Sequence, residues 1–204
     1  MLFRISWREL KIMSINKEVE FTRLDKAKKS DFDILYPYLV EQHEDLPKRV
    51  IAFLSNLKGP KLGLKVDRLE HSLQTATRAY NDNASDEEIV CALLHDIGDS
   101  LAPDNHGAFA AEILKPFVNE ANYNIVKFHP EFQGYFFFDK IGADPNVRDR
   151  HKGNEWFDAA HNFCEYWDMP AFDPNFKSKS LEFFSPVVKE VFSKKPTHNG
   201  LDII

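Results

Sequence analysis

The stretch SDEEIVCALLHDIGDS, residues 85–100, decides the fold class of this chain. Ser85 followed three residues later by Glu88 matches a capping box, in which two residues at the start of a helix satisfy each other's amide protons. Six apolar residues run from Ile89 to Leu94, and Gly98 ends the segment. The pattern predicts a short apolar helix, and an apolar helix belongs in the core of a helical protein.

The same stretch places two polar residues, His95 and Asp96, at the end of its apolar helix. An ionised carboxylate that is buried without a partner costs several kcal/mol. A bound cation removes this cost. Neighbouring residues on a helix diverge by about 100°, but both can reach a pair of ions if the carboxylate bridges them. The pair therefore indicates a candidate metal site.

Apolar residues recur with helical spacing on both sides of this stretch. We expect helices at Asp31–Leu39, Leu46–Leu57, Asp67–Tyr80, Ser85–Ile97, His106–Leu114, Asn122–Phe138, Glu155–Trp167 and Val187–Phe192. Pro130 is expected to kink or break its helix, and Pro186 to begin the last one. No strand alternation is visible. The sequence predicts an all-α fold, a single compact bundle of about seven to nine helices over residues 21–192, with a loosely ordered extension at 1–20 and a tail at 193–204.

Length and composition exclude several classes of protein. The chain has 204 residues, 43% of them hydrophobic, and a net charge of −6. An acidic chain is not expected to bind nucleic acid. No apolar run approaches the ~18 residues of a membrane span, and no secretory leader is visible, so we expect a cytoplasmic protein with a small-molecule substrate. Cys91 and Cys164 have no CxxC spacing, which argues against a disulfide framework or a cysteine zinc site.

Further imidazoles and carboxylates recur, each on a separate predicted helix. The candidate metal ligands are His71, His95, Asp96, His106, His129 and Asp168. Imidazole and carboxylate donors suit iron, zinc or manganese. A single histidine is more often a surface or hydrogen-bonded residue, and that interpretation is given to the other four, His43, His151, His161 and His198.

The ordered set resembles the HD-domain superfamily of metal-dependent enzymes. The resemblance covers roughly Phe21 to Phe192, and its strongest local matches are EHSLQ at residues 70–74 and ALLHDIG at residues 92–98. Most members of the superfamily are phosphohydrolases that use a metal-activated water. A smaller branch, similar to 2-amino-1-hydroxyethylphosphonate dioxygenase and more distantly to myo-inositol oxygenase, uses two irons and O₂ to cleave a C–P or C–C bond.

The compact length, the six ligands and the EHSLQ motif around His71 resemble the oxygenase branch more closely. The resemblance then implies two iron ions, although zinc or manganese is possible. It assigns His71, His95, Asp96 and Asp168 to one ion, and His106 and His129 to the other, with Asp96 as the bridge. The alternatives are a phosphohydrolase acting on a small phosphoester or nucleotide, and a non-catalytic ligand-binding module.

Four further positions bear on the substrate. The phosphonate oxygenase has a lysine four residues after the ligand that matches His129, and this chain has Gln133 there. We therefore expect a small hydroxylated oxyanion held mainly by the metal, with neutral contacts from Gln133 and from Gln74, which alternatively supports a ligand. Asp99 is expected to orient a ligand imidazole from behind the metal. Arg148 belongs to a basic cluster that is more often a solvated face, and alternatively receives an oxyanion.

Overall fold

The computed structural model describes residues 17–194 and 196, and within them the chain forms eight α-helices and no strand. The helices are α2 (Lys29–Glu44), α3 (Leu46–Ser55), α4 (Arg68–Asn81), α5 (Asp86–Leu94), α6 (His106–Leu114), α7 (Glu120–Gly134), α8 (Phe157–Asn162) and α9 (Leu181–Phe192). The shorter helical segments are η1 (Leu24–Lys26), η2 (Phe138–Ile141), η3 (Val147–His151) and η4 (Phe163–Asp168). The all-α prediction is confirmed. No helix among these residues is both long and apolar enough to span a membrane.

By its contacts the chain divides into two units, residues up to Pro47 and residues from Lys48 onward. The first unit contains η1 and α2, and the second contains the helices that carry every candidate ligand. The predicted boundaries at residues 20 and 193 fall beside the ends of the described region and stay predictions. His198 lies outside the described residues.

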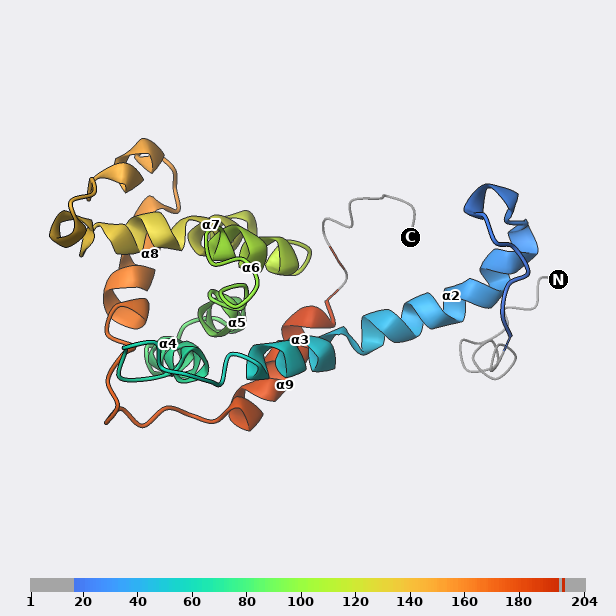
Figure 1. Cartoon of the computed structure of the whole chain (residues 1–204), viewed down its shortest axis with the longest axis horizontal. Helices are drawn as coiled ribbons and strands as arrows, with labels where there is room; N and C mark the ends of the chain where they lie inside the picture. The colour runs from blue at the N-terminus through green and yellow to red at the C-terminus, as the bar shows by residue number, and fades with distance from the viewer. Residues whose placement is uncertain (1–16, 195, 197–204) are drawn as a thin grey trace. The chain divides into compact units, whose positions relative to one another are not determined.

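Helix α5 is the centre of the second unit. It contacts α4, α7, α9 and η4, and Figure 1 shows it between α4 and the α6–α7 pair. Its residues from Ile89 to Leu94 are all buried, as the apolar run predicts. The capping box is confirmed, because the Ser85 amide donates to Glu88 Oε2 at 2.8 Å and the Glu88 amide donates to Ser85 Oγ.

Three helices differ from their predicted form. Helix α7 ends at Gly134, and Pro130 lies inside it without ending it. The helix expected to end at Trp167 changes after Asn162 into a π-helical segment, η4. The prediction that Pro186 begins the last helix is wrong, because Ser180 caps α9 and Pro186 is an interior residue.

Candidate metal centre

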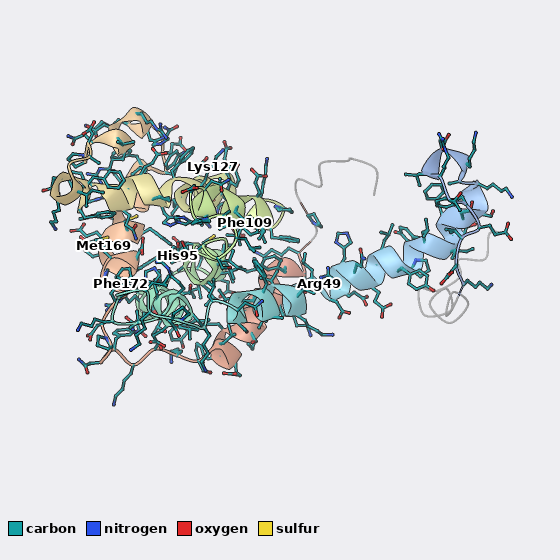
Figure 2. All side chains as sticks on the ribbon, viewed as in Figure 1. Arg49, His95, Phe109, Lys127, Met169 and Phe172 are labelled. Atoms are coloured by element: carbon teal, nitrogen blue, oxygen red, sulfur yellow. The ribbon has the colours of Figure 1, made fainter. Side chains whose placement is uncertain are left out.

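The structure brings all six candidate ligands together in the second unit. His71 lies on α4, His95 is the C-cap of α5, and Asp96 follows it. His106 begins α6, His129 lies on α7, and Asp168 ends η4. Five of the side chains are at most 7% exposed, and His106 is 20% exposed. Figure 2 labels His95 at the end of α5, in the interior of this unit.

One group of donor atoms gathers around His71. The Nε2 atoms of His71 and His95 are 3.1 Å apart, and His71 Nε2 is 3.2 Å from Asp168 Oδ1. The Nε2 atom of His95 lies 3.7 Å from the same Asp168 oxygen. These three residues therefore present two nitrogens and one oxygen to a common point.

A second group gathers around His129. The Nε2 atoms of His106 and His129 are 3.3 Å apart, and they lie 3.4 Å and 3.3 Å from Asp96 Oδ1. The other carboxylate oxygen, Asp96 Oδ2, lies 3.4 Å from His71 Nε2. Asp96 Oδ1 also lies 3.6 Å from His95 Nε2, the longest of its imidazole spacings, so Oδ1 mainly faces the second group and Oδ2 the first, which is the arrangement expected of a bridging carboxylate.

Backbone carbonyls fix the orientation of all four imidazoles. The Nδ1 atom of His71 is 3.1 Å from the carbonyl of Ala171, and that of His95 is 2.8 Å from the carbonyl of Ala92. The Nδ1 atom of His106 is 3.0 Å from the carbonyl of Pro103, and that of His129 is 2.7 Å from the carbonyl of Val126. A carbonyl only accepts, so each Nδ1 carries a proton, and an imidazole in its neutral form presents the Nε2 lone pair to the centre; an imidazole that gains a second proton donates from Nε2 to the carboxylates instead.

The facing Nε2 atoms favour a cation at the centre. Two neutral imidazoles whose Nε2 lone pairs face each other at 3.1 Å cannot form a hydrogen bond, so either a second proton on His95 or a metal ion has to lie between them. Nitrogen and oxygen ligands bind zinc-like ions at about 2.0–2.2 Å, so two ligands of one ion lie about 3.0–3.5 Å apart. Most of the spacings within the two groups, 3.1–3.4 Å, fall in this range, and the His95–Asp168 spacing of 3.7 Å lies just beyond it. The buried His and Asp groups can therefore hold a metal.

Pro130 gives α7 a special means of orienting His129. A proline has no amide proton, so Pro130 cannot donate to the carbonyl of Val126, its partner four residues earlier in a regular helix. That carbonyl accepts the Nδ1 proton of His129 instead, at 2.7 Å. The proline expected to break the helix thus frees the acceptor that orients a ligand.

Gly107 brings the neighbouring ligand close enough. A Cβ atom on Gly107 would lie 2.9 Å from the carbonyl of Lys127 and 3.1 Å from that of Val126. Only glycine allows α6 to approach the α7 backbone at this point. Because His106 is the preceding residue, this approach sets the 3.3 Å spacing between His106 and His129.

The π-helical segment places Asp168. The amide of Met169 donates to the carbonyl of Cys164 at 2.8 Å, five residues earlier. A π-turn inserts one extra residue and changes the direction in which the following side chains point, and such turns are frequent at functional sites. The side-chain amide of Gln133 donates from Nε2 to both oxygens of Asp168, at 3.1 Å and 3.0 Å. Gln133 therefore holds a candidate ligand, and its contact with substrate stays a prediction.

Electrostatics keep both carboxylates ionised. Burial by itself raises the pKa of the Asp168 carboxyl, but hydrogen bonds from His71 and His95 outweigh burial and lower it. Burial likewise opposes ionisation of Asp96, but the neighbouring imidazoles, above all the positive charge of His95, outweigh burial and lower the pKa of Asp96 well below its usual value. Burial alone lowers the pKa of His95, but the two carboxylates raise it to about 9. Burial lowers the pKa of His129.

The remaining predicted residues lie one layer further out. Both ends of the buried Gln74 amide are engaged, by Glu70 and by the backbone of Asp173, which favours its role as a support. Asp99 forms an ion pair with Arg68 at 2.6 Å and lies 4.0 Å from His106 Nδ1. The carbonyl of Pro103 is nearer to that nitrogen, so Asp99 acts on His106 mainly through its charge.

Sequence reasoning missed the loop that follows η4. Phe172 stacks on the ring of His71 with 4.4 Å between ring centroids, and the neighbouring Ala171 supplies the carbonyl for its Nδ1. Figure 2 labels Phe172 beside α4. These contacts join residues about 100 positions apart in the chain, and no local sequence pattern predicts them.

Two comparisons with known proteins bear on this centre. The family model of the HD domain matches residues 68–150. The matched range contains five of the six candidate ligands and ends before Asp168. No curated protein matches the chain. The match supports the resemblance to the HD-domain metalloenzyme superfamily, whose members are generally metal-dependent enzymes.

Proposed function

We propose that this protein is a diiron oxygenase, which uses O₂ to cleave a C–P or C–C bond of a small hydroxylated oxyanion. The observation that carries the proposal is the arrangement of four Nε2 lone pairs around a buried carboxylate whose two oxygens face different groups. In the HD-domain resemblance this donor set is the one that holds two irons. Nitrogen-rich sites of this kind suit iron as well as zinc.

The two ion positions differ in their protein ligands. His71, His95 and Asp168 serve the first, with Asp96 Oδ2 as a fourth donor. The second has His106 and His129 with Asp96 Oδ1, one donor fewer. His106 is also the most exposed of the six ligands, at 20%. Substrate therefore approaches from the side of His106, where a metal has room for further ligands.

The chain's own residues set the charge of this site. When bound, the two irons supply the redox chemistry with O₂. Asp96 and Asp168 stay ionised because their pKa values are lowered, and they neutralise two of the four positive charges of two divalent ions. The remaining positive charge attracts an anionic substrate. Gln133 holds Asp168 through both carboxylate oxygens, which keeps this ligand oriented.

A metal-dependent phosphohydrolase is the second candidate function, and the HD domain match favours it. The same six residues then bind the metals, and an activated water attacks a phosphoester. The ligand set is compatible with both reactions. The proposal prefers the oxygenase because of the resemblance in the ligand set and in EHSLQ at residues 70–74.

The deciding experiment compares metals and reactions in one preparation. Protein is loaded anaerobically with Fe(II), zinc or manganese, then assayed for O₂ consumption with hydroxyphosphonates and hydroxy acids, and for anaerobic hydrolysis of phosphoesters. We expect substrate-dependent O₂ consumption with iron alone. It should be lost in His106→Ala and kept in His43→Ala, a change at an exposed histidine of α2. Phosphoester hydrolysis with zinc or manganese, without O₂ consumption, would establish the hydrolase instead, and neither activity would leave a binding module.

A further inference from the structure

Arg148 is a buried cation that lies outside the metal centre. It belongs to η3 and is only 8% exposed. Its guanidinium carbon lies 3.5 Å from the ring centroid of Tyr135, and Nη1 lies 2.6 Å from Nδ1 of His161. Phe132 and Phe157 flank it at 5.9 Å and 5.7 Å. The sequence grouped Arg148 with Arg150 and Lys152, which are both exposed, and the structure separates it from them.

Arg148 has no anionic partner in the described part of the chain. None of the ion pairs there includes it, and its Nε atom is buried without a hydrogen-bond partner. By contrast, the exposed Arg150 pairs with Glu131. A buried guanidinium without a carboxylate is rare, because charged groups are almost never fully buried unless paired. The aromatic faces compensate only part of the desolvation.

Among the described residues the guanidinium has one polar contact, through Nη1, and its buried Nε has no hydrogen-bond partner there. Because Nη1 donates to Nδ1 of His161, that imidazole carries its proton on Nε2, which lies 3.2 Å from Glu165. Glu165 is therefore engaged by His161. The edge of Arg148 that contains Nε and Nη2 is the edge with which arginine binds two oxygens of a carboxylate or phosphate side-on.

We propose that Arg148 is the receptor of an oxyanion-binding site between α7 and α8. The ligand is a small phosphate, phosphonate or carboxylate group that binds the Nε–Nη2 edge. Nε is buried, so a neighbouring side chain moves when the anion enters. Tyr135, which is 42% exposed and covers the guanidinium, is the neighbour at the surface. The proposal rests on Arg148 and its contacts, and it holds whether the metal centre is oxidative or hydrolytic.

The position of the site connects it with the metal centre. Phe132, which flanks Arg148, is followed in α7 by Gln133, and Gln133 donates to the candidate ligand Asp168. The oxyanion has two possible sources, free phosphate or the acidic group of the substrate. Both use the same side-on contacts with Arg148, and separate arms of the test distinguish them.

The direct test observes the Nε–H group of Arg148 by ¹H–¹⁵N NMR. Inorganic phosphate added to chelator-treated protein should shift this signal in a saturable way at millimolar concentration. Arg78 is the matched control, because it also stacks on a ring, that of Phe176, and also has a buried Nε without a partner. Its Nη2 donates to the carbonyl of Pro170, a purely structural contact, so its signal should not move. An unchanged Arg148 signal in this arm would exclude free phosphate as the ligand, and the proposal is overturned if the signal also stays unchanged in the second arm.

The second arm uses protein loaded with zinc, which is diamagnetic, and a small hydroxyphosphonate in place of phosphate. A shift of the Arg148 signal with the phosphonate identifies the acidic group of a substrate-like molecule as the ligand. A shift with phosphate alone identifies a free anion. Both outcomes support the site, and the absence of a shift in both arms contradicts it. Neither arm depends on catalysis, so failure of the oxygenase proposal leaves this result interpretable.

A stability measurement separates a receptor from a structural arginine. Replacement of an uncompensated buried charge by an apolar side chain is often neutral or stabilising. Arg148→Met should therefore leave the Tm in phosphate-free buffer unchanged or higher, and should abolish the Tm rise of a few degrees that saturating phosphate gives the wild type. Arg78→Met should lower the Tm and keep the phosphate response. A large fall in Tm for Arg148→Met, with the phosphate response retained, would show that Arg148 is structural.

Discussion

Two buried charged clusters of this protein suit ligands of opposite charge. Around Asp96, two carboxylates and four imidazoles converge, a donor set that suits a cation. Around Arg148, aromatic faces and one imidazole surround a guanidinium, a setting that suits an anion. A buried charge is unfavourable unless a group of opposite charge compensates it. In each cluster, therefore, the charge of the buried groups predicts a ligand of the opposite charge.

The largest expected effect comes from removing the bridge. Asp96→Ala takes away the carboxylate that faces both donor groups, so both metals should be lost together, and activity should fall to background. Metal analysis after dialysis checks this. The control is Asp99→Ala, which removes a charge 4.0 Å from His106 Nδ1 and should retain both metals with weaker affinity. Loss of a single metal from Asp96→Ala would reject the bridge.

Asp96→Ala should not affect anion binding at the Arg148 cluster. Phosphate should still shift the Arg148 signal in Asp96→Ala, because Arg148 is held by Tyr135 and His161 and not by the metal ligands. A lost shift would break the comparison, since it would make the two clusters one site.

The second expected effect is the pH dependence of metal binding. The folded-state pKa of His95 is raised to about 9 from its ordinary value of 6.5. Its proton therefore stabilises chelator-treated protein fully below pH 6.5, and this stabilisation is lost as the pH rises toward 9. The metal must displace that proton, so metal affinity should rise by up to about tenfold per pH unit over this window.

Competition titrations with a zinc chelator between pH 6 and 9 measure this dependence, and thermal unfolding of the chelator-treated protein measures the matching loss of stability. A metal affinity that does not change across the window would contradict the assignment of His95 as a ligand. His95→Gln, which keeps a polar side chain without a titrating ring, should flatten the profile.

The third effect concerns the close approach of α6 and α7. Gly107→Ala introduces a Cβ that would lie 2.9 Å from the carbonyl of Lys127. The helices must separate, which moves His106 away from His129, and we expect metal affinity to fall by about 10–100-fold, as for other changes behind a ligand. Gly59→Ala is the matched control, because its Cβ would meet no atom within 4 Å. Equal affinities in both variants would show that the approach does not set the ligand spacing.

The fourth and smallest effect combines a rise in stability with a fall in metal affinity. Pro130→Ala restores an amide that can donate to the carbonyl of Val126, in competition with His129. The free energy of unfolding should rise, by up to about 3 kcal/mol, because proline disfavours a helix interior relative to alanine. Metal affinity should fall several-fold. Pro186→Ala, in the interior of α9, should raise stability in the same way and leave metal affinity unchanged. Identical behaviour of both variants would exclude a role for Pro130 in orienting His129.

The two clusters also differ in how far the sequence predicts them. The pair His95-Asp96 after an apolar run indicates a candidate metal site, because the run predicts that both residues are buried, and they are; the ordered set of six residues carries the rest of the prediction. The capping box at Ser85 predicts where α5 begins. In both cases the information is local. The π-turn before Asp168 carried no such signal, because a regular helix was the expectation for this segment.

Arg148 shows what local patterns cannot give. In the sequence it stands among charged residues in a segment that looks solvated. Its burial depends on Tyr135 and His161, which lie 13 residues away on either side. The same holds for Ala171, whose carbonyl orients His71 across 100 residues. Contacts of this kind arise from the packing of helices, and periodicity within one helix does not encode them.

The measurement that tests the central claim most directly is the number of metal ions bound per chain. Protein reconstituted with Fe(II), desalted and analysed for metal should hold two ions per chain, and His71→Ala and His129→Ala, one from each donor group, should each hold fewer. Two ions per wild-type chain is the result that the arrangement around Asp96 predicts. One ion or none, in a correctly folded preparation, would contradict a dinuclear centre.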